Sequence, residues 1–405
     1  MKIGLISSHS FSRPGGVKRH ILGLYQEFQK RGIDVRIIVP RRKKSEKYGK
    51  DVVLLGTSFP LKFSGSQADF CVNFNPLAIE SLLKKEKFDI IHLHNFGFPS
   101  ALQVLERSSS LNILTFHANI EQSKFFKAFP SLLYLFRQIA QWKIDGIIGV
   151  APLTLKVFNN FKGPKTVIPN GIDLGEFRPD APKLREPPFD DPQKIKILFV
   201  GRIEKRKGLI YLLRAYRVLE KKFPNLALVV VGEGELKEKC RAFIAKHELK
   251  NVYFKGAVSG PKLPSYYASS DIFCSPAIFG ESFGLVLLEA MACGTPVAAF
   301  ANRGYKELLT GKHAEKFMAK PGDWRGLAKK LEILVGNPLL REEAKRAGLA
   351  GVQEYSWPKV ADRILEFYKF ARTHHQKKER DNGFSLEDSL KKLTAKILDK
   401  VIKSF

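Results

Sequence analysis

The chain carries one strand–turn–helix–strand pattern twice, and this repeat restricts its fold more than any other feature. An apolar run at 2–7 is followed by a glycine-containing turn, a helical stripe of apolar residues and a second apolar run at 35–39. The second copy runs from the strand at 195–200 through a basic turn at 201–208 to the strand at 226–231. Short apolar strands alternating with amphipathic helices predict parallel sheets covered on both faces. We therefore predict an α/β protein with two Rossmann-like, doubly wound domains that face a central cleft.

Further short apolar runs extend both halves of the chain. They lie at 89–93, 112–116, 146–150 and 166–168 in the first half, and at 252–254, 272–274 and 296–300 in the second. We predict a first domain over 1–177, a linker rich in proline and charge over 178–193, and a second domain over 194–356. A helix at 357–372 can cross back to the first domain. A basic tail at 373–405 would contain an amphipathic helix.

Charge points to an anionic partner. Lysine and arginine number 68 against 40 acidic residues, a net charge of +28. The basic residues show no aromatic-interleaved pattern and no finger spacing, so we rank a membrane surface above nucleic acid and expect no nucleic-acid partner. A lysine-rich solvated surface is the alternative. The amphipathic tail can lie on an anionic membrane, dock on the protein or pair with another chain.

The sequence predicts a cytoplasmic protein, held peripherally at the inner face of the plasma membrane. We find neither a secretory signal nor a membrane-spanning run. The four cysteines form no CxxC pair and no metal-ligand spacing. We expect them to be buried free thiols in a reducing compartment.

A basic turn marks the second half as a binding site for an anion. Arg202 and Lys207 stand just before a predicted helix, where cations oppose the helix dipole. A diphosphate ligand would offset that cost, with Arg202 as a bidentate clamp and Lys207 as a point charge. For Lys205 and Arg206 an exposed basic turn remains the alternative. In the first half, Gly15 and Gly16 open a helix and allow close approach of phosphate to backbone.

The segment 279–296 is a glycine-rich turn followed by a nearly all-apolar helix. Glu289 lies inside that helix, where a buried carboxylate needs hydrogen-bond partners; ribose hydroxyls are one candidate and neighbouring backbone the other. Glu281 lies at the mouth and can hold sugar hydroxyls. Gly280 and Gly284 leave backbone N–H groups free for donor oxygens.

His117 follows the apolar run at 112–116 and is the histidine we favour as functional, although histidines at strand ends, such as His92 and His94, are more often structural. The chain contains no Asp-x-Asp. A donor enzyme that neutralises a diphosphate with Mg²⁺ usually has clustered carboxylates. We therefore predict no metal, with arginine, lysine and helix N-termini in its place.

Several motifs resemble one enzyme family, in order along the chain. They are Ser10-Phe11, Pro14-Gly15-Gly16-Val17, Thr115-Phe116-His117, Ile168-Pro169-Asn170-Gly171-Ile172-Asp173, Val200-Gly201-Arg202, Arg206-Lys207-Gly208, Gly280-Glu281-Ser282-Phe283-Gly284 and Leu288-Glu289-Ala290-Met291. The chain resembles the retaining GT-B glycosyltransferases of family 4 from Met1 to about Tyr368. Within that family it is most similar to the phosphatidylinositol α-mannosyltransferases.

The resemblance implies a nucleotide-sugar donor, no cofactor and transfer with retention of anomeric configuration. The implied catalytic residues are His117, near the donor sugar, and Glu281, which holds the transferred sugar. The implied donor-binding residues are Gly15, Gly16, Arg202, Lys207, Phe283, Gly284, Leu285 and Glu289. The leaving diphosphate would accept the acceptor's proton, so catalysis rests on stabilising that leaving group.

The acceptor is open at this level. We favour transfer of a hexose, from GDP-mannose or a UDP-sugar, to a phospholipid at the cytoplasmic membrane face. A soluble sugar or sugar-phosphate acceptor is the second hypothesis. A non-catalytic basic protein that binds membrane or nucleic acid, or a nucleotide-sugar epimerase, would leave part of the motif set without a purpose.

Overall fold

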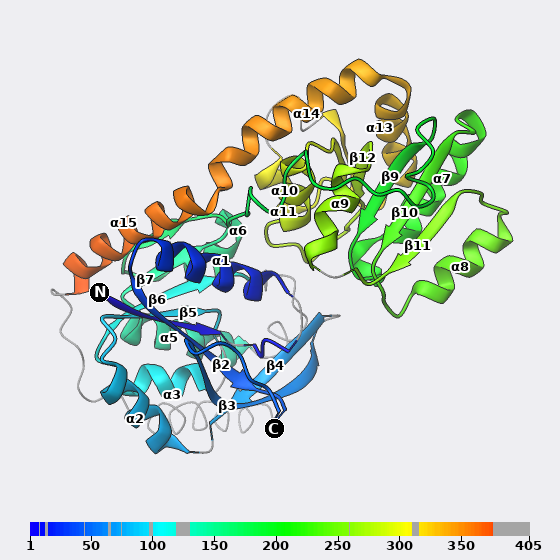
Figure 1. The fold of residues 1–405 in the computed structure, drawn as a ribbon. Coiled ribbons are helices and arrows are strands. Elements are labelled where there is room, and N and C mark those ends of the chain that lie inside the picture. Colours follow the sequence, from blue (N-terminus) through cyan, green and yellow to red (C-terminus); the bar gives the residue numbers. More distant parts are fainter. Residues whose placement is uncertain are drawn as a thin grey trace, which may run out of the picture. The chain divides into compact units, whose positions relative to one another are not determined.

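The computed structural model describes residues 1–375 except 8, 13–14, 44, 64–65, 74, 97–99, 119–129, 259 and 310–315. The basic tail predicted at 373–405 lies outside the described residues after 375, and so does all of its predicted amphipathic helix. The chain forms two compact units (Figure 1): Met1–Gly171 with the segment that begins at Trp357, and Ile172–Ser356. The first boundary falls at 171, where the sequence suggested 177. The predicted linker at 178–193 is part of the second unit.

The first unit is built on an eight-stranded sheet. Its strands are β1 (Lys2–Ser7), β2 (Asp34–Arg41), β3 (Val52–Phe63), β4 (Ser66–Val72), β5 (Ile90–His94), β6 (Leu111–Phe116), β7 (Gly146–Gly149) and β8 (Lys165–Val167). The order is β4-β3-β2-β1-β5-β6-β7-β8, and every pair is parallel except β3 with β4. The order reverses beside β1, so the loops after β1 and β5 meet at a switch point where α/β proteins bind ligands.

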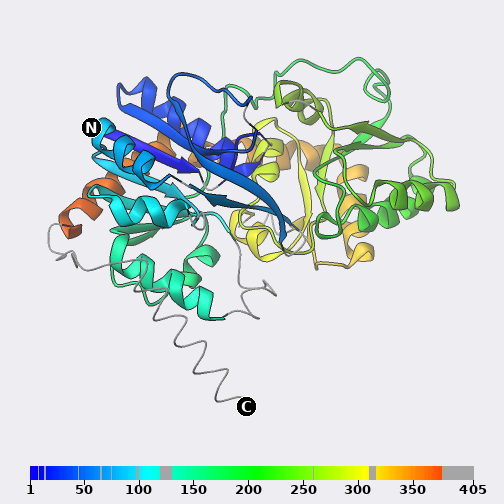
Figure 2. The ribbon, with the colours of Figure 1, turned by 90° about the horizontal axis from the view of Figure 1, so that it is seen from below.

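Helices cover both faces of this sheet (Figures 1 and 2). On one face lie α1 (Gly16–Lys30) and α15 (Trp357–His375), and on the other lie α2 (Pro76–Glu86), α3 (Ser100–Arg107) and α5 (Pro130–Lys143). Short turns α6 (Pro152–Leu155) and η1 (Lys156–Phe158) follow β7. In α1, Ile21, Leu24 and Phe28 are fully buried, as their spacing predicts.

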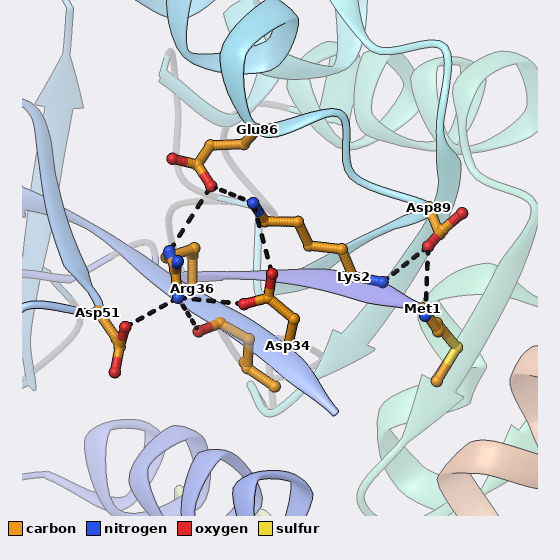
Figure 3. A network of polar contacts seen from close by, with 8 residues as sticks. Met1, Lys2, Asp34, Arg36, Asp51, Glu86 and Asp89 are labelled. Carbon is orange, nitrogen blue, oxygen red and sulfur yellow. Dashed lines mark hydrogen bonds and ion pairs between the residues drawn. The ribbon is translucent and has the colours of Figure 1, made fainter. Parts of the chain in front are cut away.

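An ion network ties together the amino-terminal ends of β1 and β2 (Figure 3). The Lys2 ammonium lies 2.6 Å from Glu86 and 3.5 Å from Asp34. Arg36 lies 2.8 Å from Asp51 and 3.1 Å from Asp34. The network stands at the sheet edge opposite the carboxyl ends of the strands, so we assign it a structural role.

The second unit has a six-stranded, fully parallel sheet. Its strands are β9 (Ile195–Val200), β10 (Leu226–Val231), β11 (Val252–Gly256), β12 (Ile272–Ser275), β13 (Val297–Phe300) and β14 (Met318–Ala319), in the order β11-β10-β9-β12-β13-β14. Its helices are α7 (Leu209–Lys222), α8 (Lys237–Lys246), α9 (Leu263–Ala268), α10 (Leu285–Ala292), α11 (Arg303–Leu308), α13 (Trp324–Gly336) and α14 (Pro338–Val352), with single turns η2 (Lys205–Lys207), η3 (Gly260–Lys262) and η4 (Gln353–Tyr355). This is the Rossmann strand order, with β9 and β12 at the switch point.

The predicted strands at 2–7, 195–200 and 226–231 have the observed bounds. The antiparallel β3–β4 hairpin was not predicted, because its polar and apolar residues alternate irregularly. All four cysteines are buried and none is part of a disulfide bond, as expected. Among the described helices, none combines the length and apolarity that a membrane crossing requires.

Candidate active site

Two cations and one carboxylate converge at the switch point of the second unit. Lys207 ends η2, after β9, and Glu281 precedes α10. The Lys207 ammonium and the Arg206 guanidinium each lie 2.8 Å from Oε1 of Glu281. Among the described residues, no ion pair or hydrogen bond reaches Oε2 of Glu281. One oxygen is therefore fixed by two cations, and the other is available to a hydroxyl group.

The cations of the basic turn differ in their exposure and in their ion-pair partners. Arg206 lies between Glu204 and Glu281 with its side chain 15% exposed. The alternative of an exposed basic turn therefore does not hold for Arg206. Lys205 is exposed, as that alternative expected. The Arg202 side chain is 48% exposed and is held by Glu204 at 3.3 Å. Arg202 thus keeps part of its guanidinium accessible to an anionic ligand.

Glu281 stays ionised in this setting. Burial raises the pKa of its carboxyl, but Lys207 and Arg206 outweigh burial and hold the pKa below 4.5. A charged carboxylate accepts hydrogen bonds from hydroxyl groups more strongly than a neutral one. The site therefore suits a sugar hydroxyl at Oε2.

Packing fixes the loop that carries Glu281. Gly284 caps α10 with φ +111°, and a Cβ there would come within 2.8 Å of the Tyr305 ring. The Tyr305 hydroxyl shares a 2.8 Å hydrogen bond with Ser275 at the end of β12. The Asn302 amide donates to the carbonyl of Ala277 at 2.9 Å. Glycine at 284 is therefore required both by its backbone angle and by space.

Glu289 has the hydrogen-bond partner that its burial demands. The residue is 2% exposed, and the Tyr267 hydroxyl donates to its Oε2 at 2.8 Å. The partner is thus a side chain of α9, which the sequence alone did not suggest. Phe283 is buried with its ring centroid 5.8 Å from that of Tyr355, and Leu285 begins α10. A role of Glu289 toward ribose stays a prediction.

In the first unit, Gly15 is the N-cap of α1 and Gly16 is the first helical residue. Gly15 makes no side-chain cap, and the first turn of α1 contains no acidic residue. A Cβ on Gly15 would meet no described atom within 4 Å, so packing does not require glycine there. The start of α1 thus offers backbone N–H groups and a positive dipole end to an anion.

His117 directly follows β6 and belongs to a group of histidines in the first unit. Its backbone N–H donates to the Asn95 side chain at 2.7 Å, and its Nε2 shares a 3.2 Å hydrogen bond with Nδ1 of His94. The His20 ring on α1 lies 4.8 Å from the His117 ring between centroids. Burial, and then the neighbouring histidines, hold the pKa of His117 well below 6.5, so the ring is neutral at pH 7.

Three of these imidazoles lie close to one another in the first unit. One nitrogen from each of His20, His94 and His117 lies within 4.8 Å of the other two. Among all the histidines, cysteines and carboxylates of the described residues, these three histidines are the group that could hold a metal ion. The sequence singled out His117 but not its grouping with His20, which only the packing of α1 on the sheet creates.

Family comparisons divide the chain at nearly the same place as the structure. Residues 14–176 match Glycosyltransferase Family 4, and residues 180–350 match Glycosyl transferases group 1. A phosphatidyl-myo-inositol mannosyltransferase from Mycobacterium leprae is 32% identical over 384 residues, which cover 93% of this chain and 99% of that protein. A D-inositol 3-phosphate glycosyltransferase from Pseudarthrobacter chlorophenolicus is 33% identical over 224 residues, covering 52% of this chain and 51% of that protein.

Solved structures share the fold at lower identity. Sucrose-phosphate synthase from Thermosynechococcus elongatus superimposes with a TM-score of 0.74 at 20% identity, covering 92% of this chain and 99% of that chain. Anabaena Alr3699/HepE in complex with UDP and glucose gives a TM-score of 0.70 at 21% identity, with 91% and 99% covered. Both comparisons extend over the two Rossmann-like units. The chain therefore belongs to the group 1, family 4 glycosyltransferases of the GT-B fold, together with the phosphatidyl-myo-inositol mannosyltransferases.

Proposed function

We propose that this glycosyltransferase moves a hexose from a nucleotide sugar to a phospholipid headgroup at the cytoplasmic face of a membrane, with retention and without a metal ion. The observation that carries the proposal is the Glu281 carboxylate, whose Oε1 is fixed by Lys207 and Arg206 while Oε2 stays available. This arrangement can hold a sugar beside cations that stabilise a leaving diphosphate. The names of the mannosyltransferase relatives support a lipid acceptor.

In this proposal each residue has a separate task. Arg202 and Lys207 bind the diphosphate, Glu281 binds hydroxyls of the transferred hexose, and Glu289 binds the ribose. The backbone N–H groups of Phe283, Gly284 and Leu285 supply further donors. Gly15 and Gly16 approach the diphosphate through their backbone, and His117 contacts the hexose. The leaving diphosphate accepts the proton of the attacking hydroxyl, so no side-chain nucleophile is needed.

Cations in place of a metal support a metal-free reaction. Arg202, Arg206 and Lys207 surround the site, and Glu204 and Glu281 offset only part of their charge. A diphosphate would therefore meet a group of side chains with a net positive charge. Transfer is expected to continue in EDTA, and activity that EDTA abolishes and Mg²⁺ restores would contradict this part of the proposal.

The decisive experiment measures transfer with each donor and each acceptor separately. GDP-mannose, UDP-glucose and UDP-GlcNAc are tested against vesicles containing phosphatidylinositol and against soluble inositol phosphate. Glu281→Ala should lower turnover by about 10²–10³-fold, the usual effect of losing one preorganised transition-state contact. Glu238→Ala, at a side chain that is 77% exposed, is the matched control. Undiminished turnover of Glu281→Ala would refute the assignment. Transfer only to the soluble acceptor would favour the second hypothesis.

A further inference from the structure

Histidines gather at one place in the first unit. Of the nine in the chain, five lie at or near the carboxyl edge of its sheet: His9 after β1, His20 on α1, His92 and His94 on β5, and His117 after β6. They come from four separate segments of the chain, so their meeting is a product of the fold. The proposed transfer reaction uses His117 alone, which leaves the others to be explained.

Three of the five lie close enough together to share one ligand. Nitrogens of His20, His94 and His117 all lie within 4.8 Å of one another, with 3.2 Å between Nδ1 of His94 and Nε2 of His117. His92 is different, because both of its nitrogens are occupied, by the Tyr368 hydroxyl and by the Thr115 hydroxyl at 2.6 Å each. His92 therefore supports the group from behind and is not one of the ligands.

Several buried polar atoms of His20 and Asn170 have no hydrogen-bond partner among the described residues. His20 is 2% exposed, and no described residue forms a hydrogen bond with either of its ring nitrogens. Asn170 is 6% exposed, and in the described part of the chain its Oδ1 has no hydrogen-bond partner either. The Asn170 side chain lies close enough to His20 and His117 to favour their protonated forms, but no atom pair there meets hydrogen-bond geometry. Buried polar atoms are nearly always paired, so these point to a polar ligand.

The protonation states suit a cation. Burial lowers the pKa of His20 to about 4, and burial together with neighbouring histidines holds the pKa values of His94 and His117 well below 6.5. All three rings are thus neutral at pH 7 and keep a lone pair on one nitrogen. Metal ions bind the neutral imidazole, so no ring has to lose a net proton; the proton shared by His94 and His117 moves to another ring nitrogen when both bind the metal.

We propose that His20, His94 and His117 bind one divalent transition-metal ion, of which Zn²⁺ is the representative. Three histidines with a fourth position open to water are an established zinc donor set. Mg²⁺ and Ca²⁺ prefer oxygen ligands, so this site does not take them. Zinc–nitrogen bonds of about 2.0–2.1 Å require the three nitrogens to lie about 3.4 Å apart, so small ring rotations complete the site.

Metal binding would oppose the transfer reaction. This consequence rests on the proposed function, in which His117 contacts the donor hexose. A metal that takes the His117 ring removes that contact, so Zn²⁺ acts as an inhibitor of an enzyme that itself needs no metal. The metal site and the diphosphate-binding residues Arg202 and Lys207 belong to different units and are separate features.

Co²⁺ binding to the full-length protein tests the site without reference to activity. Tetrahedral Co²⁺ gives strong visible absorption bands, and we expect one equivalent per chain. His20→Phe and His94→Gln should each weaken binding at least ~100-fold, more than the 10–100-fold typical of losing an outer partner. His374→Gln, an exposed histidine on α15, is the matched control and should bind like wild type. If His20→Phe does not fold, His94→Gln and the wild-type titration decide. Absence of stoichiometric binding, or equal binding by the ligand variants, overturns the proposal.

Zn²⁺ inhibition is the second arm. Zn²⁺ should inhibit transfer by wild type and by His374→Gln, EDTA should relieve the inhibition, and His20→Phe should resist it. Co²⁺ binding in a protein that transfers no hexose would sustain the metal site and refute the proposed function. Hexose transfer without Co²⁺ binding would do the reverse.

Discussion

The Glu281 carboxylate shows how single residues define this site. Two cations meet on Oε1, at 2.8 Å each, and Glu204 holds Arg206 from its other side. Alternating charges of this kind reduce the cost of burying each one, because every ion has a partner. The partly exposed Arg202, at the end of this row of ion pairs, is the cation that the protein's own carboxylates hold least tightly.

That difference between neighbouring cations gives a prediction. Arg202→Ala should lower kcat/KM for the nucleotide sugar by about 10²–10³-fold, because in the proposed function Arg202 binds the diphosphate in the transition state. Lys205→Ala removes a cation three residues away whose side chain is exposed, and it should change kcat/KM less than about twofold. Steady-state kinetics of the two variants provide the measurement. Equal losses would mean that the turn acts only through its overall charge.

The depressed pKa of Glu281 leads to a second prediction at this scale. The folded protein keeps the carboxylate charged at pH values where the unfolded chain takes up a proton. The stabilisation is therefore present above about pH 4.5 and is lost as pH falls through the lower folded pKa. The difference in unfolding free energy between wild type and Glu281→Gln should shrink below about pH 4.5. Urea unfolding at a series of pH values measures it, and a difference that stays constant into strong acid would contradict the ion-pair interpretation.

At the scale of elements, the contact of α15 with α1 depends on the absence of a side chain at Gly23. A Cβ on Gly23, within α1, would lie 2.1 Å from the Trp357 indole, which begins α15. The indole also lies 5.3 Å from the His20 ring between centroids. Gly23 therefore allows the two helices to approach, and it accepts the usual helix cost of glycine to do so.

Alanine substitutions at two helical glycines test this contact. Gly23→Ala should lower the free energy of unfolding by about 1–3 kcal/mol, because the Trp357 indole or α15 has to move. Gly348→Ala in α14 meets Met291 only at 3.4 Å and should raise stability by about 0.5–1 kcal/mol through helix propensity. Denaturant unfolding measures both variants. A stabilising Gly23→Ala would show that α15 does not pack on α1 as described.

At the scale of the whole molecule, the two ends of the described chain build one unit. The chain leaves the first unit after Gly171 and returns to it at Trp357. From there α15 covers the sheet face beside α1. Trp357, Val360, Ile364 and Tyr368 are buried there, and the Tyr368 hydroxyl bonds to His92. The second unit, Ile172–Ser356, contains its own complete sheet.

Truncation separates these contributions. A chain ending at Ser356 lacks α15 and should lose amide protection in β1, β5 and β6, while the strands of the second unit stay protected. A chain ending at His375 keeps α15 and should match the full-length protein. Hydrogen exchange followed by mass spectrometry makes the comparison. Equal protection of β1 in both truncated chains would refute the role of α15.

Local pattern determined much of this protein. Apolar runs at 2–7, 195–200 and 226–231 predicted buried parallel strands, since each is short and mostly apolar and such runs alternate with amphipathic helices. Arg202 and Lys207 could likewise be predicted from the basic turn before α7, and Glu281 from the glycine-rich turn before α10. The charge and the glycine content of these two turns are visible in the sequence.

Tertiary structure alone decided which residues meet. Oε1 of Glu281 faces Lys207 and Arg206, and Glu289 faces Tyr267, across gaps of 74, 75 and 22 residues along the chain. His20 joins His94 and His117 only because α1 packs on the sheet over β1 and β2. Periodicity reports which side of an element is buried, but partners across the core depend on how elements pack. That information is shared among distant segments, so no local stretch of sequence contains it.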